Sequence, residues 1–359
     1  MDKKNKNPNV PNLRFLKFNQ NYETLQLKNT LKIKSGKDQK QVEVENGIYN
    51  IYGTGGIIGH TNTFLYDKES VGIGRKGTID KPVYFNQPFW TVDTLFYSEI
   101  YEGFIPKYIF YLFQTINWKK YNTSTGVPSL TSSSIENIEK SFPCYDEQLK
   151  VANFLTMIDM RIETQIKIIN DYKILKNHII KSYIKQNGTS YLLSEIAELG
   201  RGRVINSAEI SKQKNPIYPV YSSQTSNNGI MGYLDNYDYE GEYITWTTDG
   251  ANAGTVYYRN GKFNCTNVCG ILKIKNGYDA YYISNILNCY TKKYVSTNLA
   301  NPKLMNNVMA NIKINLPSIE QQKHSSKILQ SIEYRVEIEE DIKLNLVKQK
   351  AFLLKNMFI

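Results

Sequence analysis

The chain has 359 residues, of which 41% are hydrophobic, and this length predicts two or three domains with buried cores. Its 44 lysines and arginines outnumber 33 acidic residues, and the net charge of +11 favours a polyanion such as nucleic acid as a partner, although a generally lysine-rich proteome would produce the same balance. No run of about 20 apolar residues and no apolar N-terminal segment occur, which excludes a membrane-spanning or exported protein and predicts a cytoplasmic one.

The first part of the chain predicts a polar arm followed by a sheet-rich domain. Residues 1–22 are rich in Asn, Lys and Pro, and residues 23–142 contain short apolar runs separated by turn residues. Apolar residues recur at helical spacing over residues 106–119, which predicts one helix inside this domain. The clearest predicted strands are residues 47–52, 83–85 and 91–97.

A long helix is predicted next, over residues 143–187. Proline and glycine are absent between residues 147 and 185, and apolar residues follow one another at steps of three and four, as in a heptad seam. The pair Asn187-Gly188 ends the pattern. The predicted seam residues are Leu155, Ile158, Ile162, Ile169, Tyr172 and Ile179.

The second half repeats this plan. Residues 188–316 are strand-rich, with strands predicted at 218–221 and 243–246, and residues 317–359 predict a second long helix. Its seam residues are Leu329, Ile332, Val336, Leu346 and Leu353. A lone helix of this kind would expose its apolar stripe, so we predict that the two helices pair in antiparallel fashion; the alternative is that each packs on its own domain. A rod of about 57 Å could set the spacing between two DNA readers.

Landmarks of the first half recur in the second half at a nearly constant interval. A repeat of this length indicates two copies of a whole domain, because solenoid units span only about 20–50 residues. The matched positions are Pro143 and Pro317 (317 − 143 = 174), Gly56 and Gly229 (229 − 56 = 173), Gly77 and Gly254 (254 − 77 = 177), Phe89 and Phe263, and Pro128 and Pro302. Two domains in one chain suit a target that has two parts.

No catalytic residue, metal site or cofactor site is predicted. Cys265 and Cys269 have no second pair of ligands nearby, and the four cysteines do not recur between the halves, so we expect reduced thiols. Residues 72–77 match the glycine pattern of dinucleotide-binding proteins, but Pro82 and strand-forming residues follow instead of a helix. Residues 86–89 read Asn-Gln-Pro-Phe, which departs from the Asn-Pro-Pro-Phe motif of adenine methyltransferases.

Candidate DNA contacts are basic and polar residues in the predicted turns and loops. Lys and Arg position DNA through its phosphates, while Arg, Asn and Asp read guanine, adenine and cytosine respectively. The alternatives are an ordinary hairpin tip and solvated loops. The first turn is basic and its counterpart is neutral or acidic, so the two domains are not expected to read the same sequence. The candidates are Lys37, Arg75, Lys76, Thr78, Lys119, Lys120, Asn122, Arg201, Arg203, Asp249, Asn252, Lys292, Lys293 and Asn298.

The chain resembles the specificity subunit of a type I restriction-modification system over essentially its whole length. No single motif is specific, but their order and duplication are. Gln321 departs from the acidic residue that is common in the family at that position. The segments that carry the resemblance are Leu13-Arg-Phe15, residues 34–37, residues 91–95, Pro143 with Glu147-Gln148, Arg201-Gly-Arg203, residues 263–269, Pro317 with Gln321-Gln322, and residues 353–358.

The resemblance implies an α+β fold with two similar sheet-rich target recognition domains, residues 23–142 and 188–316, separated by two long antiparallel, coiled-coil-like spacer helices. It implies a non-catalytic subunit whose domains each read one half of a split, asymmetric site in double-stranded DNA. The seam-bearing helices would bind two methyltransferase (modification) subunits that methylate adenine N6, and restriction subunits would join them. S-adenosylmethionine, ATP and Mg²⁺ would then belong to these partner subunits, and this chain would bind no cofactor.

Two other functions remain open from the residues alone. One is a coiled-coil scaffold whose domains, rich in the chain's 28 tyrosines, bind protein or RNA. The other is a fused methyltransferase or nuclease. A scaffold would lack a steep salt dependence on double-stranded DNA, and a fused enzyme would show turnover by itself.

Overall fold

The computed structural model describes residues 10–185, 188–296 and 301–359. The chain divides into two compact units, each with one sheet-rich domain and a segment of each long helix. Unit 1 comprises Met1–Lys167 and Glu340–Ile359, and unit 2 comprises Ile168–Glu339. Among the described residues, no helix is both long and apolar enough to cross a bilayer.

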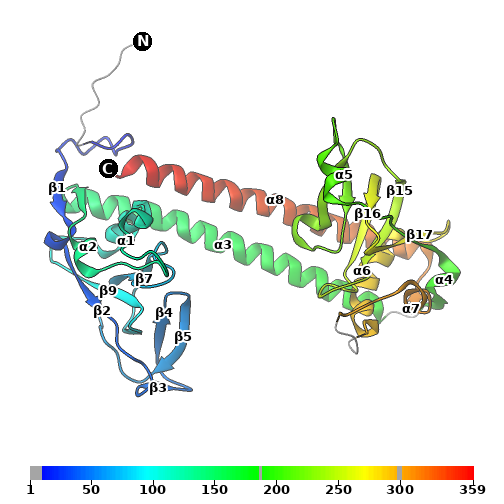
Figure 1. The fold of residues 1–359 in the computed structure, drawn as a ribbon, viewed down its shortest axis with the longest axis horizontal. Coiled ribbons are helices and arrows are strands. Elements are labelled where there is room, and N and C mark those ends of the chain that lie inside the picture. Colours follow the sequence, from blue (N-terminus) through cyan, green and yellow to red (C-terminus); the bar gives the residue numbers. More distant parts are fainter. Residues whose placement is uncertain (1–9, 186–187, 297–300) are drawn as a thin grey trace, which may run out of the picture. The chain divides into compact units, whose positions relative to one another are not determined.

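Unit 1 contains two four-stranded sheets and a separate strand pair (Figure 1). The first sheet has the order β2 (Leu31–Ser35), β9 (Leu95–Ile100), β6 (Ser70–Gly74), β7 (Val83–Phe85), and the second has the order β3 (Glu43–Val44), β5 (Gly56–Thr61), β4 (Tyr49–Gly53), β8 (Phe89–Thr91). The separate pair is β1 (Glu23–Gln26) with β10 (Glu139–Phe142). The helical elements of this domain are η1 (Leu27–Asn29), α1 (Pro106–Thr115), η2 (Trp118–Tyr121) and α2 (Ser132–Glu136).

Helix α1 is shorter than the predicted helix over residues 106–119. It ends at Thr115, because Ile116 has an extended backbone (φ −79°, ψ 130°). The apolar pattern continues past this end, since Ile116 and Trp118 are both buried, and the Trp118 indole donates to the Phe113 carbonyl at 2.9 Å. The predicted helix was too long because Ile116 and Trp118 continue the apolar spacing, although Trp118 already belongs to the 3-10 helix η2.

The predicted strand over residues 91–97 is two strands in different sheets. Strand β8 ends at Thr91 and β9 begins at Leu95, and a turn closed by a 3.0 Å bond from the Leu95 amide to the Val92 carbonyl separates them. The sequence does not reveal where the chain passes from one sheet to the other, because the residues on both sides of this turn are apolar and buried. They are Trp90, Val92, Leu95 and Phe96.

Unit 2 is built on one six-stranded sheet and, again, a separate strand pair. The sheet has the order β12 (Ala197–Arg201), β17 (Cys269–Ile274), β15 (Tyr239–Thr247), β16 (Val256–Cys265), β13 (Tyr218–Tyr221), β14 (Ile230–Leu234). The pair is β11 (Thr189–Leu192) with β18 (Lys313–Leu316). The helical elements are α4 (Leu193–Ile196), α5 (Ser207–Ser211), η3 (Ser226–Gly229), α6 (Ala280–Tyr290), η4 (Thr291–Tyr294) and α7 (Asn306–Ala310).

The repeated Pro…Gln motif makes the same two hydrogen bonds in both units. Buried Gln148 accepts from the amide of Ile105, the residue before α1, at 3.1 Å and donates to the Pro143 carbonyl at 3.0 Å. Buried Gln322 accepts from the amide of Asp279, the residue before α6, at 3.1 Å and donates to the Pro317 carbonyl at 2.9 Å. The motif thus fastens the start of each long helix to the first turn of a domain helix.

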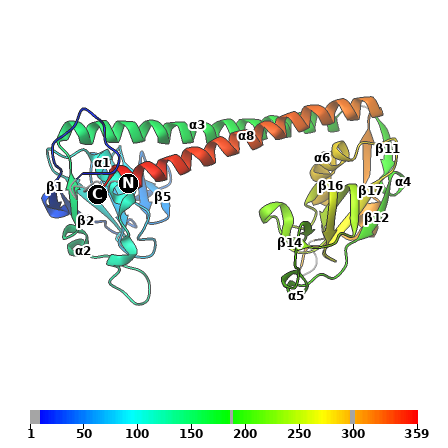
Figure 2. The same cartoon turned by 90° about the horizontal axis from the view of Figure 1, so that it is seen from above.

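The long helices are α3 (Tyr145–Ile184) and α8 (Ile319–Met357), and their segments run antiparallel within each unit (Figures 1 and 2). In unit 1, Lys350 Nζ lies 2.6 Å from Asp159 Oδ1, and in unit 2, Lys176 Nζ lies 2.9 Å from Glu333 Oε1. The predicted fold class and helix pairing are therefore confirmed.

Candidate nucleic-acid interface

The basic turn after β6 is fixed by its backbone on both sides. The amide of Arg75 donates to the Thr94 carbonyl at 2.8 Å, and the amide of Gly77 donates to the Pro128 carbonyl at 2.9 Å. Gly77 has φ +86°, a left-handed conformation that glycine adopts without strain. The side chain of Lys76 is exposed and that of Thr78 is half-buried. A rigid turn therefore presents Lys76 to solvent.

The equivalent turn in unit 2 is centred on Gly250, and the predicted match of Gly77 with Gly254 is wrong. The amide of Gly250, with φ +93°, donates to the Pro302 carbonyl at 3.0 Å, as Gly77 does to Pro128. The interval is then 173 residues (250 − 77), in line with neighbouring landmarks. Exposed Asn252 lies between this turn and β16, in a segment as long as the one between Gly77 and β7.

This alignment places opposite charges at equivalent positions. Lys76 precedes Gly77, and Asp249 precedes Gly250. The Asp249 carboxylate accepts from Asn301 Nδ2 at 3.0 Å and lies 3.9 Å from Lys303 Nζ, so it is partly neutralised. The two turns share one backbone arrangement, but one presents a lysine to a ligand and the other an aspartate.

A groove of about 270 Å³ opens beside the basic turn in unit 1. Arg75 and Lys76 line it, and Arg75 is steadied by a 3.2 Å bond from Nη1 to the Asp93 carbonyl. Cationic and hydroxyl groups together are the donors that bind DNA phosphates. The hydroxyl side chains in its lining are Ser35, Ser129, Thr131 and Ser132.

The loop after α1 contributes exposed Lys120 and an organising asparagine. Lys119 is exposed as well, and its Nζ lies 3.4 Å from Asp80 Oδ2. The Asn122 side chain accepts from the amides of Ser124 (3.1 Å) and Ser129 (2.9 Å) and donates to the Ser124 carbonyl. Asn122 therefore shapes the loop, and the two lysines are the groups left to face a phosphate.

The corresponding loop of unit 2 begins with η4. Lys292 and Lys293 are exposed, and Lys293 Nζ lies over the rings of Tyr290 and Tyr294, 4.6 and 5.3 Å from their centroids. The last candidate of this loop, Asn298, lies outside the described residues. Both units thus carry two exposed lysines at the equivalent place.

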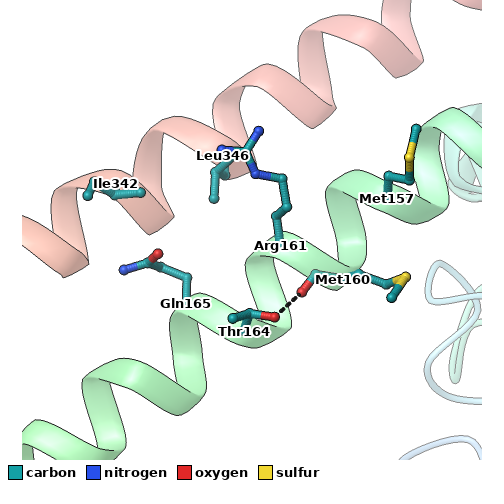
Figure 3. A pocket seen from close by; sticks show the side chains of 7 residues that line it. All are labelled: Met157, Met160, Arg161, Thr164, Gln165, Ile342 and Leu346. Carbon is teal, nitrogen blue, oxygen red and sulfur yellow. Dashed lines mark hydrogen bonds between the residues drawn. The ribbon is translucent and has the colours of Figure 1, made fainter.

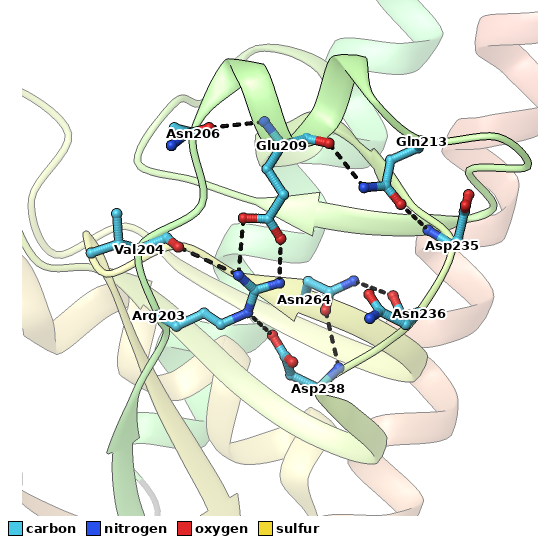
Figure 4. Close-up of polar contacts among 9 residues, drawn as sticks. All are labelled: Arg203, Val204, Asn206, Glu209, Gln213, Asp235, Asn236, Asp238 and Asn264. Carbon is cyan, nitrogen blue, oxygen red and sulfur yellow. Dashed lines mark hydrogen bonds and ion pairs between the residues drawn. The ribbon is translucent and has the colours of Figure 1, made fainter.

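Lys37 and Arg203 occupy equivalent positions but have different surroundings. The Lys37 amide donates to the Thr91 carbonyl at 2.9 Å, and the Arg203 amide donates to the Cys265 carbonyl at 3.1 Å, 174 residues further on (265 − 91). The Lys37 side chain is exposed. Arg203 is clamped by Glu209, through bonds of 2.7 and 3.1 Å, and by Asp238 at 3.0 Å (Figure 4).

The contact between Arg203 and Glu209 shifts a pKa, and Arg201 makes structural hydrogen bonds of a similar kind. The hydrogen bond from Arg203 lowers the pKa of Glu209. Arg201 donates from Nε to the Asn267 carbonyl at 2.5 Å and from Nη2 to Thr248 Oγ1 at 3.3 Å. Both arginines thus hold backbone segments of unit 2 together, a structural use that the sequence prediction missed.

The predicted partner-contacting residues of the long helices pack inside the chain. Leu155, Ile158, Ile169, Leu329, Ile332, Leu346 and Leu353 are buried, and Ile162, Tyr172, Ile179 and Val336 are half-buried. A partner protein would have to contact other residues. In unit 1, exposed Met157, Met160 and Ile342 line a largely apolar groove of about 470 Å³ between α3 and α8 (Figure 3).

Together these features define a duplicated, sheet-rich architecture with paired helices and exposed lysines at equivalent places. The type I restriction modification DNA specificity domain model matches residues 19–171 and again residues 187–349. The type I specificity subunit S.MpnORF365P of Mycoplasma pneumoniae is 37% identical over 224 residues, covering 60% of this chain and 82% of that protein. The chain therefore belongs to the family of type I restriction-modification specificity subunits. It is the non-catalytic, DNA-recognising component of such a system.

Solved structures share this fold. The crystal structure of a type I restriction-modification S subunit from M. genitalium matches with a TM-score of 0.69 and 17% sequence identity, covering 98% of this chain and 99% of that chain. A chain from a structural study of complex assembly and conformational transition in a type I restriction-modification system matches with a TM-score of 0.58 and 11% identity, covering 93% of this chain and 96% of that chain. At these identities the likeness concerns the fold alone.

Proposed function

We propose that this chain reads a split, asymmetric DNA site with two different recognition domains, residues 23–142 and 188–316. The observation that carries this proposal is the pair of equivalent turns with opposite charges, Lys76 before Gly77 and Asp249 before Gly250. A lysine favours phosphate or guanine, and an aspartate can accept from cytosine. Two copies of one scaffold with different groups at the same point would select different half-sites.

Exposed lysines beside these turns would position the protein on the DNA backbone. Lys119 and Lys120 in unit 1 and Lys292 and Lys293 in unit 2 are all exposed. Contacts to phosphate register a protein on the duplex without reading sequence. Binding by this route would weaken steeply as salt concentration rises.

The long helices, residues 143–187 and 317–359 with their connecting segments, would carry two methyltransferase subunits. The groove lined by Met157, Met160 and Ile342 suits an apolar partner side chain, because flexible methionines adapt to the shape of what they contact. Those subunits would use S-adenosylmethionine to methylate adenine N6 in the cytoplasm. Restriction subunits, where they join, would supply the chemistry that needs ATP and Mg²⁺.

The test is to map methylated adenines in the host genome with and without this gene. We expect one bipartite motif to disappear when the gene is deleted. Replacing residues 23–142 with the matching domain of another family member should change one half of the motif and leave the other. A motif that survives deletion, or one in which both halves change after the replacement, would contradict the proposal.

A further inference from the structure

The β13–β14 connection of unit 2 is longer than its counterpart in unit 1. Tyr52 and Tyr221 are equivalent, because their carbonyls accept from the amides of Val92 (3.0 Å) and Thr266 (2.9 Å), which are 174 residues apart (266 − 92). Tyr52 pairs with Ile57, leaving four residues between them (57 − 52 − 1). Tyr221 pairs with Ile230, leaving eight (230 − 221 − 1). Loop 222–229 thus has eight residues and contains an insertion of four residues relative to the equivalent connection in the first domain.

A second difference lies directly beneath this loop. In unit 1, the buried ring of Phe85 packs on Tyr52, with centroids 4.9 Å apart. The residue 174 positions later (259 − 85) is Arg259, which is only 3% exposed and places its guanidinium 3.5 Å from the centroid of the Tyr221 ring. An aromatic pair in one domain is therefore a cation–π pair in the other.

Arg259 links the sheet to the loop. Its Nη2 donates to the Asn228 carbonyl at 3.0 Å, and its Nε donates to Thr245 Oγ1 at 3.2 Å. Among the described carboxylates, none forms an ion pair with it, so burial lowers the pKa of this guanidinium. A buried cation without a counter-ion is costly. The hydrogen bond that Arg259 donates to the Asn228 carbonyl of the loop offsets part of the free-energy cost of burying this cation.

The loop has a defined backbone and a polar tip. Asn227 and Asn228 have φ values of +47° and +52°, and Gly229 has +84°, so three successive residues are left-handed. The Ser222 amide closes the loop with a 2.9 Å bond to the Gly229 carbonyl. The side chains of the tip, Thr225, Ser226, Asn227 and Asn228, are all exposed. Sparsely populated conformations of this kind cluster at functional sites.

The loop also lies near the segment that follows the turn centred on Gly250. Asn228 lines a polar cavity of about 410 Å³ together with Thr255 and Val256, which follow the turn centred on Gly250. In unit 1 the short connection is at the same place, since Thr54 Oγ1 lies 3.9 Å from where a side chain on Gly77 would begin. The insertion therefore adds amide and hydroxyl groups near the segment that follows the candidate DNA-contacting turn.

We propose that loop 222–229 is a base-reading element of the second recognition domain and that Arg259 is its positioning residue. This inference rests on the proposed DNA-reading function and names the part of the second domain that reads. An exposed asparagine amide can pair with adenine through two hydrogen bonds in the major groove. The left-handed backbone, held by Arg259 at Asn228, would fix the direction of the amides.

The test uses the full chain together with its methyltransferase subunits, and it sequences the DNA that this complex selects from a randomised pool. Replacing Asn227 and Asn228 by glycine keeps the left-handed backbone and removes both amides. We expect preference at one or two bases of one half-site to fall about tenfold or more, with the other half-site and the melting temperature unchanged. Asn276→Gly, an exposed asparagine in another turn of unit 2, is the matched control.

The positioning role of Arg259 is tested by Arg259→Met, which keeps the stem and removes the donors. It should weaken preference at the same bases as the double glycine variant, a readout that a merely structural role would not move. If the double glycine variant selects the wild-type sequence at full preference, the inference is overturned while the proposed function stands. If the wild-type complex selects no split site at all, the proposed function fails, and the inference fails with it.

Discussion

The guanidinium of Arg14 donates to both carboxylate oxygens of Glu147, at 2.8 Å from Nε and 2.7 Å from Nη2. Glu147 is fully buried, and the Tyr22 hydroxyl donates to the same carboxylate at 3.0 Å. This pair ties the N-terminal arm to the first turn of α3. The repeat position, Gln321, is exposed, and its side chain accepts from the amide of nearby Ser318 at 3.3 Å. An acid is therefore needed in the copy where the arm supplies an arginine.

We predict that Glu147→Ala lowers the free energy of unfolding by about 3–5 kcal/mol, because it leaves Arg14 and the Tyr22 hydroxyl without their buried partner. Gln321→Ala removes only exposed hydrogen bonds and should cost about 1 kcal/mol or less. Denaturant unfolding of the two variants measures both values. Equal losses would show that the arm does not depend on this ion pair.

The antiparallel helix contact in unit 1 predicts a large effect at Leu155. This side chain is fully buried in a cluster that also contains Leu353 and Met357 of α8. Leu155→Ala should therefore destabilise the protein by about 2–5 kcal/mol. Leu149, on the same helix but 41% exposed, is the control, and its alanine variant should change stability by about 0.5 kcal/mol or less. A small effect at Leu155 would mean that the helices are not packed as described.

The basic turn predicts a specific change in salt dependence. Lys76 is exposed beside the groove lined by Arg75 and hydroxyl groups. If it neutralises one phosphate, Lys76→Ala should reduce the slope of log K against log salt by about 1, without lowering stability. Lys28→Ala, an exposed lysine in η1, should leave the slope unchanged. An unaltered slope in Lys76→Ala would remove this turn from the interface.

Structural features that follow from a periodic pattern in the sequence could be predicted. Features that depend on contacts with residues far away in the sequence could not. The long helices follow from uninterrupted apolar steps of three and four, and strands such as β7 and β13 match their predicted limits. The predicted end of helix α1 lay too far along the chain, because Ile116 and Trp118 are buried in the core of the domain although they lie beyond the helix. A local pattern reports burial but not the point at which the backbone changes direction.

The candidate site shows the same limit. Charge and turn residues correctly indicated exposed cations such as Lys76, but nothing near Arg203 in the sequence shows that Asp238, 35 residues away, neutralises it. The match of Gly77 with Gly254 failed because another Gly-Thr pair occurs by chance four residues after Gly250. The shift of interval near residue 222 and the change from Phe85 to Arg259 were present in the sequence and could have identified the inserted loop.

Lys37 and Arg203 allow one position of the fold to be tested for two roles. Lys37→Ala should weaken DNA binding at high salt and leave the unfolding free energy within about 0.5 kcal/mol of wild type, because the lysine is exposed. Arg203→Met should lower stability, because it leaves Glu209 and Asp238 facing each other without the guanidinium. Binding assays over a salt series and thermal melting separate these outcomes. The reverse pattern would assign the phosphate contact to Arg203.

The clamp on Arg203 also predicts a pH dependence of stability. The guanidinium lowers the pKa of Glu209 below its ordinary value of 4.5, so the folded state binds this proton less readily than the unfolded state. The resulting stabilisation is present above pH 4.5 and is lost as the pH falls through the depressed pKa. Glu209→Gln removes the titrating group, so the stability difference between wild type and this variant should shrink on acidification from pH 6 to pH 3. A difference that stays constant over this range would show that Glu209 does not titrate in contact with Arg203.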